Sequence, residues 1–212
     1  YKIFEDIAEE LKADAIAVAH HQDDQIETII QKLFRGGSPE SWAGMRELDA
    51  PLFRPMLEFS KQEILAYCDE KSIPYRDDES NSDPKYSRNF LRGEFSEKMN
   101  NLFPGWQQNV LGLSDFGMLN EKMLDQLSEV YLGKERLKLA PIEKMDEILA
   151  LSLIKRFLEQ FIPVVSKGII SEAFSLFSAQ TGSELKVSDS VILVKDRDYI
   201  VLRKKAEFTE VI

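Results

Sequence analysis

The chain has 212 residues, of which 43% are hydrophobic and 30% are charged, a composition typical of a globular protein with one large or two modest domains. Its apolar stretches, such as Ala15–Ala19, fall far short of the roughly 20 residues of a membrane span, so we expect no membrane partner and a cytoplasmic protein. The single cysteine, Cys68, excludes an internal disulfide and a four-cysteine metal site within this chain. Because the sequence starts at Tyr1 without a leader, we expect it to be the middle of a longer natural chain.

The net charge of −10, from 27 basic and 37 acidic residues, at first argues against a nucleic-acid partner. The acid is unevenly distributed, however. Residues 1–105 hold 13 basic and 21 acidic residues, whereas residues 106–212 hold 14 and 16. The second half is therefore nearly neutral, and the total charge does not decide the question of a nucleic-acid partner.

The first half has the pattern of an α/β fold. Apolar residues at helical spacing predict a helix over Lys2–Lys12, and the apolar run Ala15–Ala19 is typical of a buried parallel strand. A second helical stripe runs from Ile26 to Leu33 and ends at two glycines, Gly36 and Gly37, which are better interpreted as a C-cap than as a phosphate loop. Leu52-Phe53 predicts another strand.

Two further segments complete the first half. Ser60 followed by Glu63 is a capping box that opens an amphipathic helix through Cys68. The run Arg76–Lys85 is too polar for a core and predicts a loop. The order helix, strand, helix, strand, helix favours helices packed on a mostly parallel sheet.

Pro104-Gly105 predicts a boundary between two domains, residues 1–105 and 106–212. The second domain is predicted to be small and mainly helical, with a terminal β-hairpin formed by two apolar runs around the turn Asp196–Asp198. Its expected elements are helices over Trp106–Leu132, Ile142–Phe161 and Ser166–Ala179 and strands over Ser190–Lys195 and Tyr199–Arg203.

The densest polar cluster, His20–Thr28, lies where a strand leads into a helix, and open α/β sheets bind ligands beyond the carboxyl ends of their strands. On that helix Asp24 and Glu27 share one face with Thr28, Gln31 and Arg35. Two carboxylates at this spacing can bind a cationic amine or, with Asp23, a divalent metal ion. The alternative is that these acids only stabilise the positive end of the helix dipole.

The order His-His-x-Asp-Asp is also compatible with a metallohydrolase. Such metal sites usually draw a further histidine, cysteine or carboxylate from elsewhere in the chain. No third histidine exists here, so the remaining ligands would have to be carboxylates. A metallohydrolase is therefore the weaker interpretation.

A second polar cluster follows the predicted loop. Arg88 and Arg92 are four residues apart, so that a helix would present their guanidinium groups side by side to phosphates. Alternatively they pair with nearby acids. Arg54, after the second strand, is a weaker candidate, and the basic run Arg203–Lys205 is more typical of a solvated strand edge. The chain contains neither G-x-x-x-x-G-K-[ST] nor G-x-G-x-x-G.

Taken in order, these segments resemble the tRNA(Ile)-lysidine synthase family of the PP-loop (N-type) ATP pyrophosphatase superfamily. Each piece is weak, but the ordered series over residues 15–95 is specific. The matching segments are Ala19–Thr28, Leu33–Gly36, Ala43–Met45, Phe53–Leu57, Ser60–Ile64, Tyr67-Cys68, Asp78–Asn81, Arg88-Asn89 and Arg92.

The resemblance implies the remainder of a Rossmann-like PP-loop ATPase domain, followed by a helical substrate-binding domain. It also implies a ligase that uses ATP and Mg²⁺. ATP would adenylate the C2 oxygen of the wobble cytidine of tRNA(Ile) with a CAU anticodon, and free L-lysine would then displace AMP to leave lysidine. The implied partners are this tRNA and lysine; a homodimer stays open.

The resemblance also assigns roles to residues. Asp24 and Glu27 would hold lysine and act in catalysis with His21, which would orient the site or move a proton. Asp23 would contact ATP or Mg²⁺. The groups expected to face ATP, its phosphates or the tRNA are Asp23, Arg35, Arg54, Arg88, Asn89 and Arg92. Because nucleotidyl transfer depends mainly on positioning and charge stabilisation, no nucleophilic side chain is required.

The sequence departs from the family pattern in three places. The phosphate loop Ser-Gly-Gly-x-Asp-Ser is absent and would lie upstream of Tyr1, Lys32 replaces the usual arginine, and Gly37–Ser41 differs from the usual glycine-rich run. We therefore expect these 212 residues alone to be unable to adenylate a substrate. Related tRNA thiolases need cysteine pairs, which Cys68 cannot supply. Another PP-loop synthetase and a non-catalytic tRNA-binding relic stay open.

Overall fold

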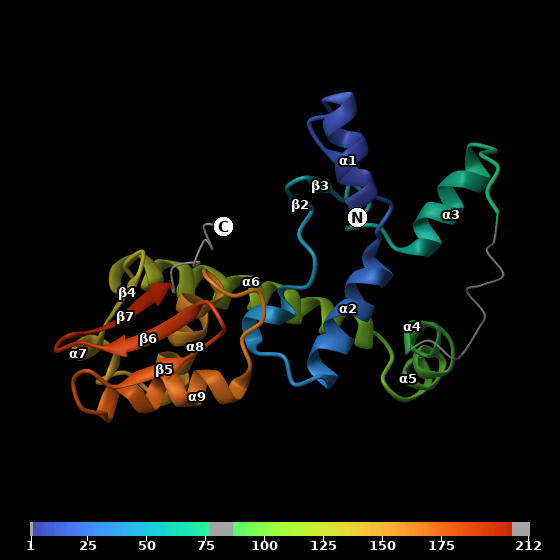
Figure 1. The fold of residues 1–212 in the computed structure, drawn as a ribbon. Coiled ribbons are helices and arrows are strands. Elements are labelled where there is room, and N and C mark those ends of the chain that lie inside the picture. The colour runs from blue at the N-terminus through green and yellow to red at the C-terminus, as the bar shows by residue number, and fades with distance from the viewer. Residues whose placement is uncertain (1, 77–86, 205–212) are drawn as a thin grey trace. The chain divides into compact units, whose positions relative to one another are not determined.

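A computed structural model describes residues 2–76 and 87–204, which divide into two compact units, Tyr1–Glu121 and Lys122–Ile212 (Figure 1). The division lies within helix α6 (Trp106–Tyr131), later than the boundary expected after Gly105. The first part of α6 belongs to unit 1 because it packs on residues of that unit: the Ser114 hydroxyl donates to the carbonyl of Ala43 at 2.7 Å. A functional boundary at residue 105 stays a prediction.

Unit 1 contains the expected α/β arrangement around a small sheet with the strand order β1-β3-β2. The two strands expected from the sequence pair in parallel, with Ile16 opposite Leu52. The remaining strand, β2, pairs antiparallel with β3. The elements up to the loop are α1 Lys2–Leu11, β1 Ile16–Ala17, α2 Gln22–Phe34, η1 Pro39–Ala43, β2 Leu48–Asp49, β3 Leu52–Phe53 and α3 Lys61–Glu70.

The structure confirms a strand within Ala15–Ala19, but the predicted length and burial are wrong. β1 covers only Ile16–Ala17, with Ile16 half-buried and Ala17 exposed. The apolar face of α1 is likewise exposed, with Ile3 at 72% and Leu11 at 71%. The reason is that, within residues 2–76 and 87–204, no second layer covers this part of the sheet and α1.

Local signals for the helix ends are confirmed. At the start of α3 the Ser60 hydroxyl accepts the N–H of Glu63 at 3.2 Å, and the Glu63 carboxylate accepts the N–H of Ser60 at 2.8 Å. α2 ends at Phe34, and Gly36 follows with φ +71°, a conformation that favours glycine. Of the polar run expected as a loop, only Arg76 is described, and residues 77–85 lie outside the described residues.

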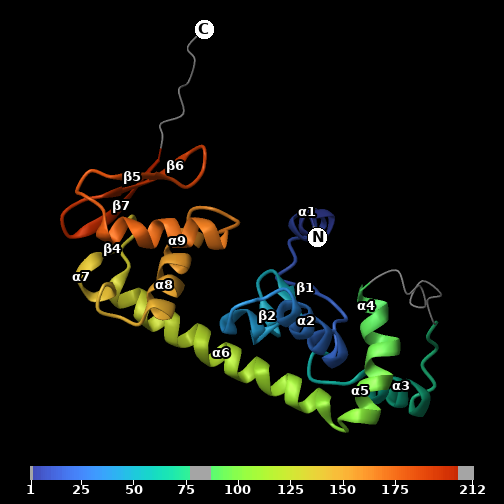
Figure 2. The same ribbon diagram turned by 90° about the horizontal axis from the view of Figure 1, so that it is seen from below.

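A helical segment after that run completes unit 1. It consists of α4 (Ser87–Phe90), the π-helical turn η3 (Leu91–Phe95) and α5 (Ser96–Leu102), which follow one another as a nearly continuous rod (Figure 2). The segment packs on α2 and the start of α6 through a small buried cluster. That cluster consists of Ile26, Ile30, Leu91 and Trp106.

Unit 2 is built around a four-stranded antiparallel sheet with the order β4-β7-β6-β5. Helices α8 and α9 lie on one side of this sheet (Figure 2), and the core between them contains Phe157 and Ile200. Besides the end of α6, the elements are β4 Arg136–Lys138, α7 Leu139–Ile142, α8 Glu147–Glu159, α9 Lys167–Ser175, η4 Leu176–Ser178, β5 Glu184–Lys186, β6 Val191–Lys195 and β7 Tyr199–Lys204.

The expected terminal hairpin is confirmed, because β6 and β7 pair with Val194 opposite Val201. The flanking strands β4 and β5 were not expected, since each has three residues with one inward apolar side chain, Leu137 or Leu185. The helix expected from Ile142 instead begins at Glu147, where the Asp146 carboxylate accepts the N–H of Ile148 at 2.9 Å. In the part of the chain that the structure describes, no helix has the length and apolar character to cross a membrane.

Candidate functional site

Four charged side chains from distant parts of the sequence form one cluster in unit 1. Asp24 and Glu27 lie on successive turns of α2 and are only 6% and 4% exposed. Arg88 donates through Nε to Glu27 at 2.7 Å, and Arg92 donates through Nε to Glu27 at 2.5 Å. Arg92 also donates through Nη2 to Asp24 at 2.7 Å. The structure thus brings together the two polar clusters that the sequence showed separately.

The charges in this cluster balance, with two carboxylates and two guanidinium groups. Buried carboxylates need such partners, because desolvating an unpaired charge is costly. The pKa of Arg92 responds to this environment. Burial alone would lower it, but the hydrogen bond and charge of Glu27, together with the charge of Asp24, raise it above its ordinary value. Of the two expectations for Arg88 and Arg92, pairing with nearby acids is the one that matches the observed geometry.

His21 and Asp23 extend the cluster to the start of α3. The imidazole of His21 lies 3.5 Å from a carboxylate oxygen of Asp24 through Nε2 and 3.5 Å from one of Asp23 through Nδ1. The same Asp23 oxygen accepts the backbone N–H of Lys61 at 2.9 Å. The first turns of α2 and α3 are therefore connected through Asp23.

His20 joins the site although sequence reasoning assigned a role only to His21. Its pKa is lowered by burial, against the opposing charge of Asp24, and the positive charges of Arg54 and Arg88 lower it further. Its buried Nδ1 has no hydrogen-bond partner among the described residues. The adjacent position in the same polar run is the signal that could have identified it.

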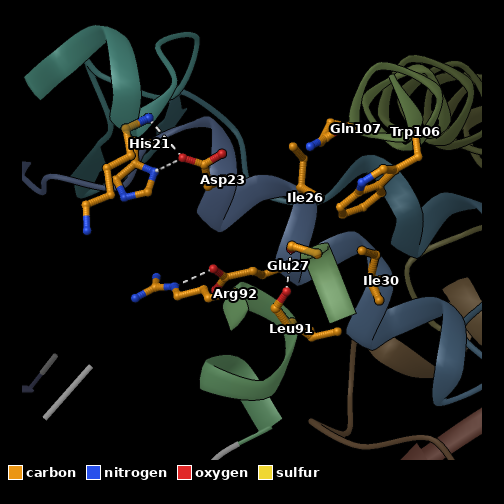
Figure 3. A pocket seen from close by; sticks show the side chains of 11 residues that line it. His21, Asp23, Ile26, Glu27, Ile30, Leu91, Arg92, Trp106 and Gln107 are labelled. Carbon is orange, nitrogen blue, oxygen red and sulfur yellow. Dashed lines mark hydrogen bonds and ion pairs between the residues drawn. The ribbon is translucent and has the colours of Figure 1, made fainter. Parts of the chain in front are cut away.

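A pocket of about 320 Å³ opens beside the charge cluster (Figure 3). Charged side chains gather at one end and apolar side chains at the other, so the pocket suits a ligand with an apolar stem and charged groups. The charged or polar lining is His21, Asp23, Glu27, Lys61, Arg92, Ser96 and Gln107, and the apolar lining is Ile26, Ile30, Leu91 and Trp106.

Several of these lining residues were missed from the sequence. Trp106 and Gln107 stand at the start of α6, far in sequence from the polar motifs, and Ser96 begins α5. Nothing in their local pattern indicates a pocket. Lys61 had a signal, since it is the first residue of the helix opened by the Ser60 capping box.

The remaining predicted site residues do not line the pocket. Arg54 is 6% exposed and donates through Nη1 to the carbonyl of Arg46 at 2.8 Å, close enough to His20 to affect its pKa. Asn89 is half-buried on α4. Arg35 is exposed at the opposite end of α2 from Asp24, so the shared helix face does not bring it to the pocket.

Gln25 is a second residue of the polar run whose role only the structure shows. Its buried amide donates to the carbonyls of Ala43 and Met45, each at 3.1 Å, and to the Ser114 hydroxyl at 3.2 Å. Its carbonyl oxygen accepts the N–H of Met45 at 2.7 Å. Gly44, with φ +73°, lies so close that a Cβ there would be 2.6 Å from this amide. Gln25 therefore holds the segment Ala43–Met45 against α2.

A resident metal ion has little support from these side chains. Within residues 2–76 and 87–204, no group of three or more His, Cys, Asp or Glu is arranged to hold one. Mg²⁺ commonly uses one or two carboxylates together with substrate phosphates. Asp23 as a Mg²⁺ contact therefore stays a prediction, and no chemical step is assigned to it here.

Comparison with known proteins agrees with this arrangement. Residues 1–99 match the PP-loop domain family. A tRNA(Ile)-lysidine synthase from Parabacteroides distasonis is 29% identical across 100% of this chain and 49% of its own length. Others from Treponema denticola and Staphylococcus epidermidis are 38% and 37% identical over 52% and 64% of this chain, and 24% and 32% of their own lengths. The chain thus spans about half or less of the length of these relatives. Residues 1–99 therefore match a PP-loop domain, and the chain is similar along its whole length to a tRNA(Ile)-lysidine synthase.

Proposed function

We propose that the complete natural protein containing these 212 residues is a tRNA(Ile)-lysidine synthase. The observation that carries the proposal is the cluster of Asp24, Glu27, Arg88 and Arg92 beside a pocket that is charged at one end and apolar at the other. It lies in a PP-loop domain, whose family uses ATP, and the relatives named as lysidine synthases extend over the whole chain.

The proposed reaction has two steps. The C2 oxygen of the wobble cytidine of tRNA(Ile) with a CAU anticodon attacks the α-phosphorus of ATP, and pyrophosphate leaves. An amine of free L-lysine then attacks C2, and AMP leaves with the oxygen. Both steps need reactants held in line and negative charge stabilised, which positioned arginines can supply.

The pocket offers each part of lysine a complementary surface. The aliphatic stem would lie along Ile26, Leu91 and Trp106, as long charged side chains do on apolar surfaces. The ammonium groups would face the carboxylates of Glu27, which lines the pocket, and of Asp24, which shares Arg92 with it. The lysine carboxylate would face Lys61.

Asp24 and Glu27 already accept hydrogen bonds from arginines, so lysine and the arginines compete for the same oxygens. We propose that Arg88 and Arg92 turn toward the phosphates of bound ATP, which leaves the carboxylates for the cationic amine. Arginine suits both partners because its planar fork matches carboxylate and phosphate oxygens alike. His21, within 3.5 Å of Asp23 and Asp24, would orient the site or move a proton.

The test is incorporation of labelled lysine into tRNA(Ile) by the complete natural protein. Glu27→Gln and Asp24→Asn should abolish incorporation, because a neutral amide does not attract an ammonium group, while tRNA binding should persist. Glu9→Gln on the exposed face of α1 is the matched control and should keep full activity.

Unchanged turnover in the Glu27 and Asp24 variants would refute the site assignment. Absence of lysine-dependent activity in the unmodified protein would refute the function. The 212 residues alone, without a phosphate loop, should show no ATP–pyrophosphate exchange.

A further inference from the structure

A row of aromatic rings leads from the pocket of unit 1 to its surface. Trp106 lines the pocket and meets Phe95 edge-on, with ring centroids 5.6 Å apart and planes at 89°. On its other sides Phe95 contacts Phe34, with centroids 6.2 Å apart, and Phe90, with centroids 6.4 Å apart. Three segments contribute to this row, namely α2, the rod formed by α4 and η3, and the start of α6.

The outer two rings face solvent. The side chain of Phe34 is 68% exposed and that of Phe90 is 44% exposed, whereas Phe95 is half-buried and Trp106 is buried. An exposed phenylalanine forgoes the free energy of burying its ring, so an exposed pair is of interest as a binding surface. Phe95 holds both exposed rings, and we refer to Phe34 and Phe90 as the aromatic platform.

Positive charge borders the platform. Arg35 follows Phe34 directly and is exposed, and no carboxylate of residues 2–76 and 87–204 pairs with it. Phe90 stands between Arg88 and Arg92 in the sequence, and the Arg88 side chain is 44% exposed. Exposed aromatic rings flanked by arginines are the surface that binds unpaired nucleobases and the phosphates between them.

The location of the platform connects it with the proposed reaction. Trp106 is both the inner end of the aromatic row and part of the pocket lining, so the platform is continuous with the site through Phe95. A wobble cytidine lies in a single-stranded loop, and a base withdrawn into a site leaves unpaired neighbours outside it.

We propose that Phe34 and Phe90 stack on the unpaired bases next to the target cytidine, and that Arg35 contacts the phosphate backbone there. This inference rests on the proposed function, since it assumes an RNA substrate. It explains how a chain with a net charge of −10 binds RNA: the binding energy comes from stacking and a few local arginines, and not from a broad basic surface.

The test measures the affinity of the complete natural protein for an anticodon stem-loop of tRNA(Ile). The double variant Phe34→Leu/Phe90→Leu keeps apolar volume but loses the rings, and it should bind about tenfold more weakly, because leucine offers no flat surface on which a base can stack. Phe34→Tyr/Phe90→Tyr keeps the rings and should bind like the unmodified protein. Phe116→Leu, an exposed phenylalanine of unit 1 outside the row, is the control and should bind normally.

A second RNA distinguishes stacking from a structural effect. If the nucleotides on both sides of the cytidine lack their bases, the unmodified protein should lose the same tenfold, and the leucine variant should lose nothing further. The proposal would be overturned if the leucine variant bound both RNAs more weakly than the unmodified protein by the same factor. The proposal would also be overturned if the leucine variant binds the intact RNA normally but the sedimentation coefficient of the protein itself changes. That result would indicate a protein interface. If the unmodified protein binds no stem-loop, the proposed function itself fails.

Discussion

The two units of this chain differ in what their interiors contain. Unit 2 has one contiguous core of apolar side chains between its sheet and helices α8 and α9, including Phe157, Leu153 and Ile200 at 0% exposure. Unit 1 has a much smaller apolar cluster. Among the described residues, all the buried polar and charged ones lie in unit 1, namely Asp24, Gln25, Glu27, Arg54 and Ser114.

The difference shows which unit holds buried groups that depend on specific partners. The apolar core stabilises unit 2 by burial and tolerates no uncompensated charge. In unit 1 the buried polar groups must satisfy one another through specific hydrogen bonds, which makes stability depend on geometry. Such a site can exchange its internal partners for a ligand, whereas an apolar core cannot. Functional sites are where proteins commonly depart from simple packing rules.

The largest change in the free energy of unfolding is expected from a substitution that disrupts the core of unit 2. Phe157→Ala removes a fully buried ring that also contacts Phe161 and should lower the free energy of unfolding of the protein by about 3–5 kcal/mol. Urea denaturation followed by circular dichroism measures this change. Because no charge is involved, the loss should be the same at low and high salt. Phe161, itself half-buried, provides the control, and Phe161→Ala should cost less.

An intermediate effect is expected from the charge cluster of unit 1. Arg92→Ala leaves Asp24 and Glu27 with one fewer partner and should cost about 3 kcal/mol, at the lower end for a broken buried pair because Arg92 is itself one third exposed. Unlike the loss at Phe157, this loss should shrink at high salt, which screens the interactions of partly exposed charges. Lys98→Ala, which breaks only an exposed pair with Glu94, should change stability by less than about 1 kcal/mol. An Arg92 loss that is the same at low and high salt would contradict the electrostatic description of unit 1.

The smallest effect concerns the cap of α3. Ser60→Ala removes the hydroxyl that accepts the Glu63 N–H and should cost about 1 kcal/mol. The side-chain and backbone hydrogen bonds from Ser60 also lower the pKa of Glu63 below its ordinary value. A lowered pKa in the folded state means that this contribution is present above the pKa of the unfolded chain and is lost as the pH falls through the folded pKa. The cost of Ser60→Ala should therefore diminish in acid, as thermal melts at pH 7 and pH 3 would show.

Short-range features could be predicted well from the sequence. The extent of α1 and α2, the capping box at Ser60 and the β6–β7 hairpin follow from neighbours within four residues, or from two apolar runs around one turn. The same short-range spacing predicted that Asp24 and Glu27 share a face of one helix and that Arg88 and Arg92 share a face of another helix. It failed for the strands β4 and β5, because three residues with a single inward side chain carry too little pattern.

The sequence by itself thus determined the elements, the polar motifs and the resemblance to the PP-loop family, because those depend on residue order. Only the tertiary structure decided that Glu27 meets Arg88 and Arg92, 61 and 65 residues away, and that Trp106 closes the pocket beside them. Whether two distant segments meet depends on how the chain between them packs, here through the buried cluster of Ile26, Ile30 and Leu91. No local pattern records that path, which is why the aromatic platform and the role of Gln25 appear only in three dimensions.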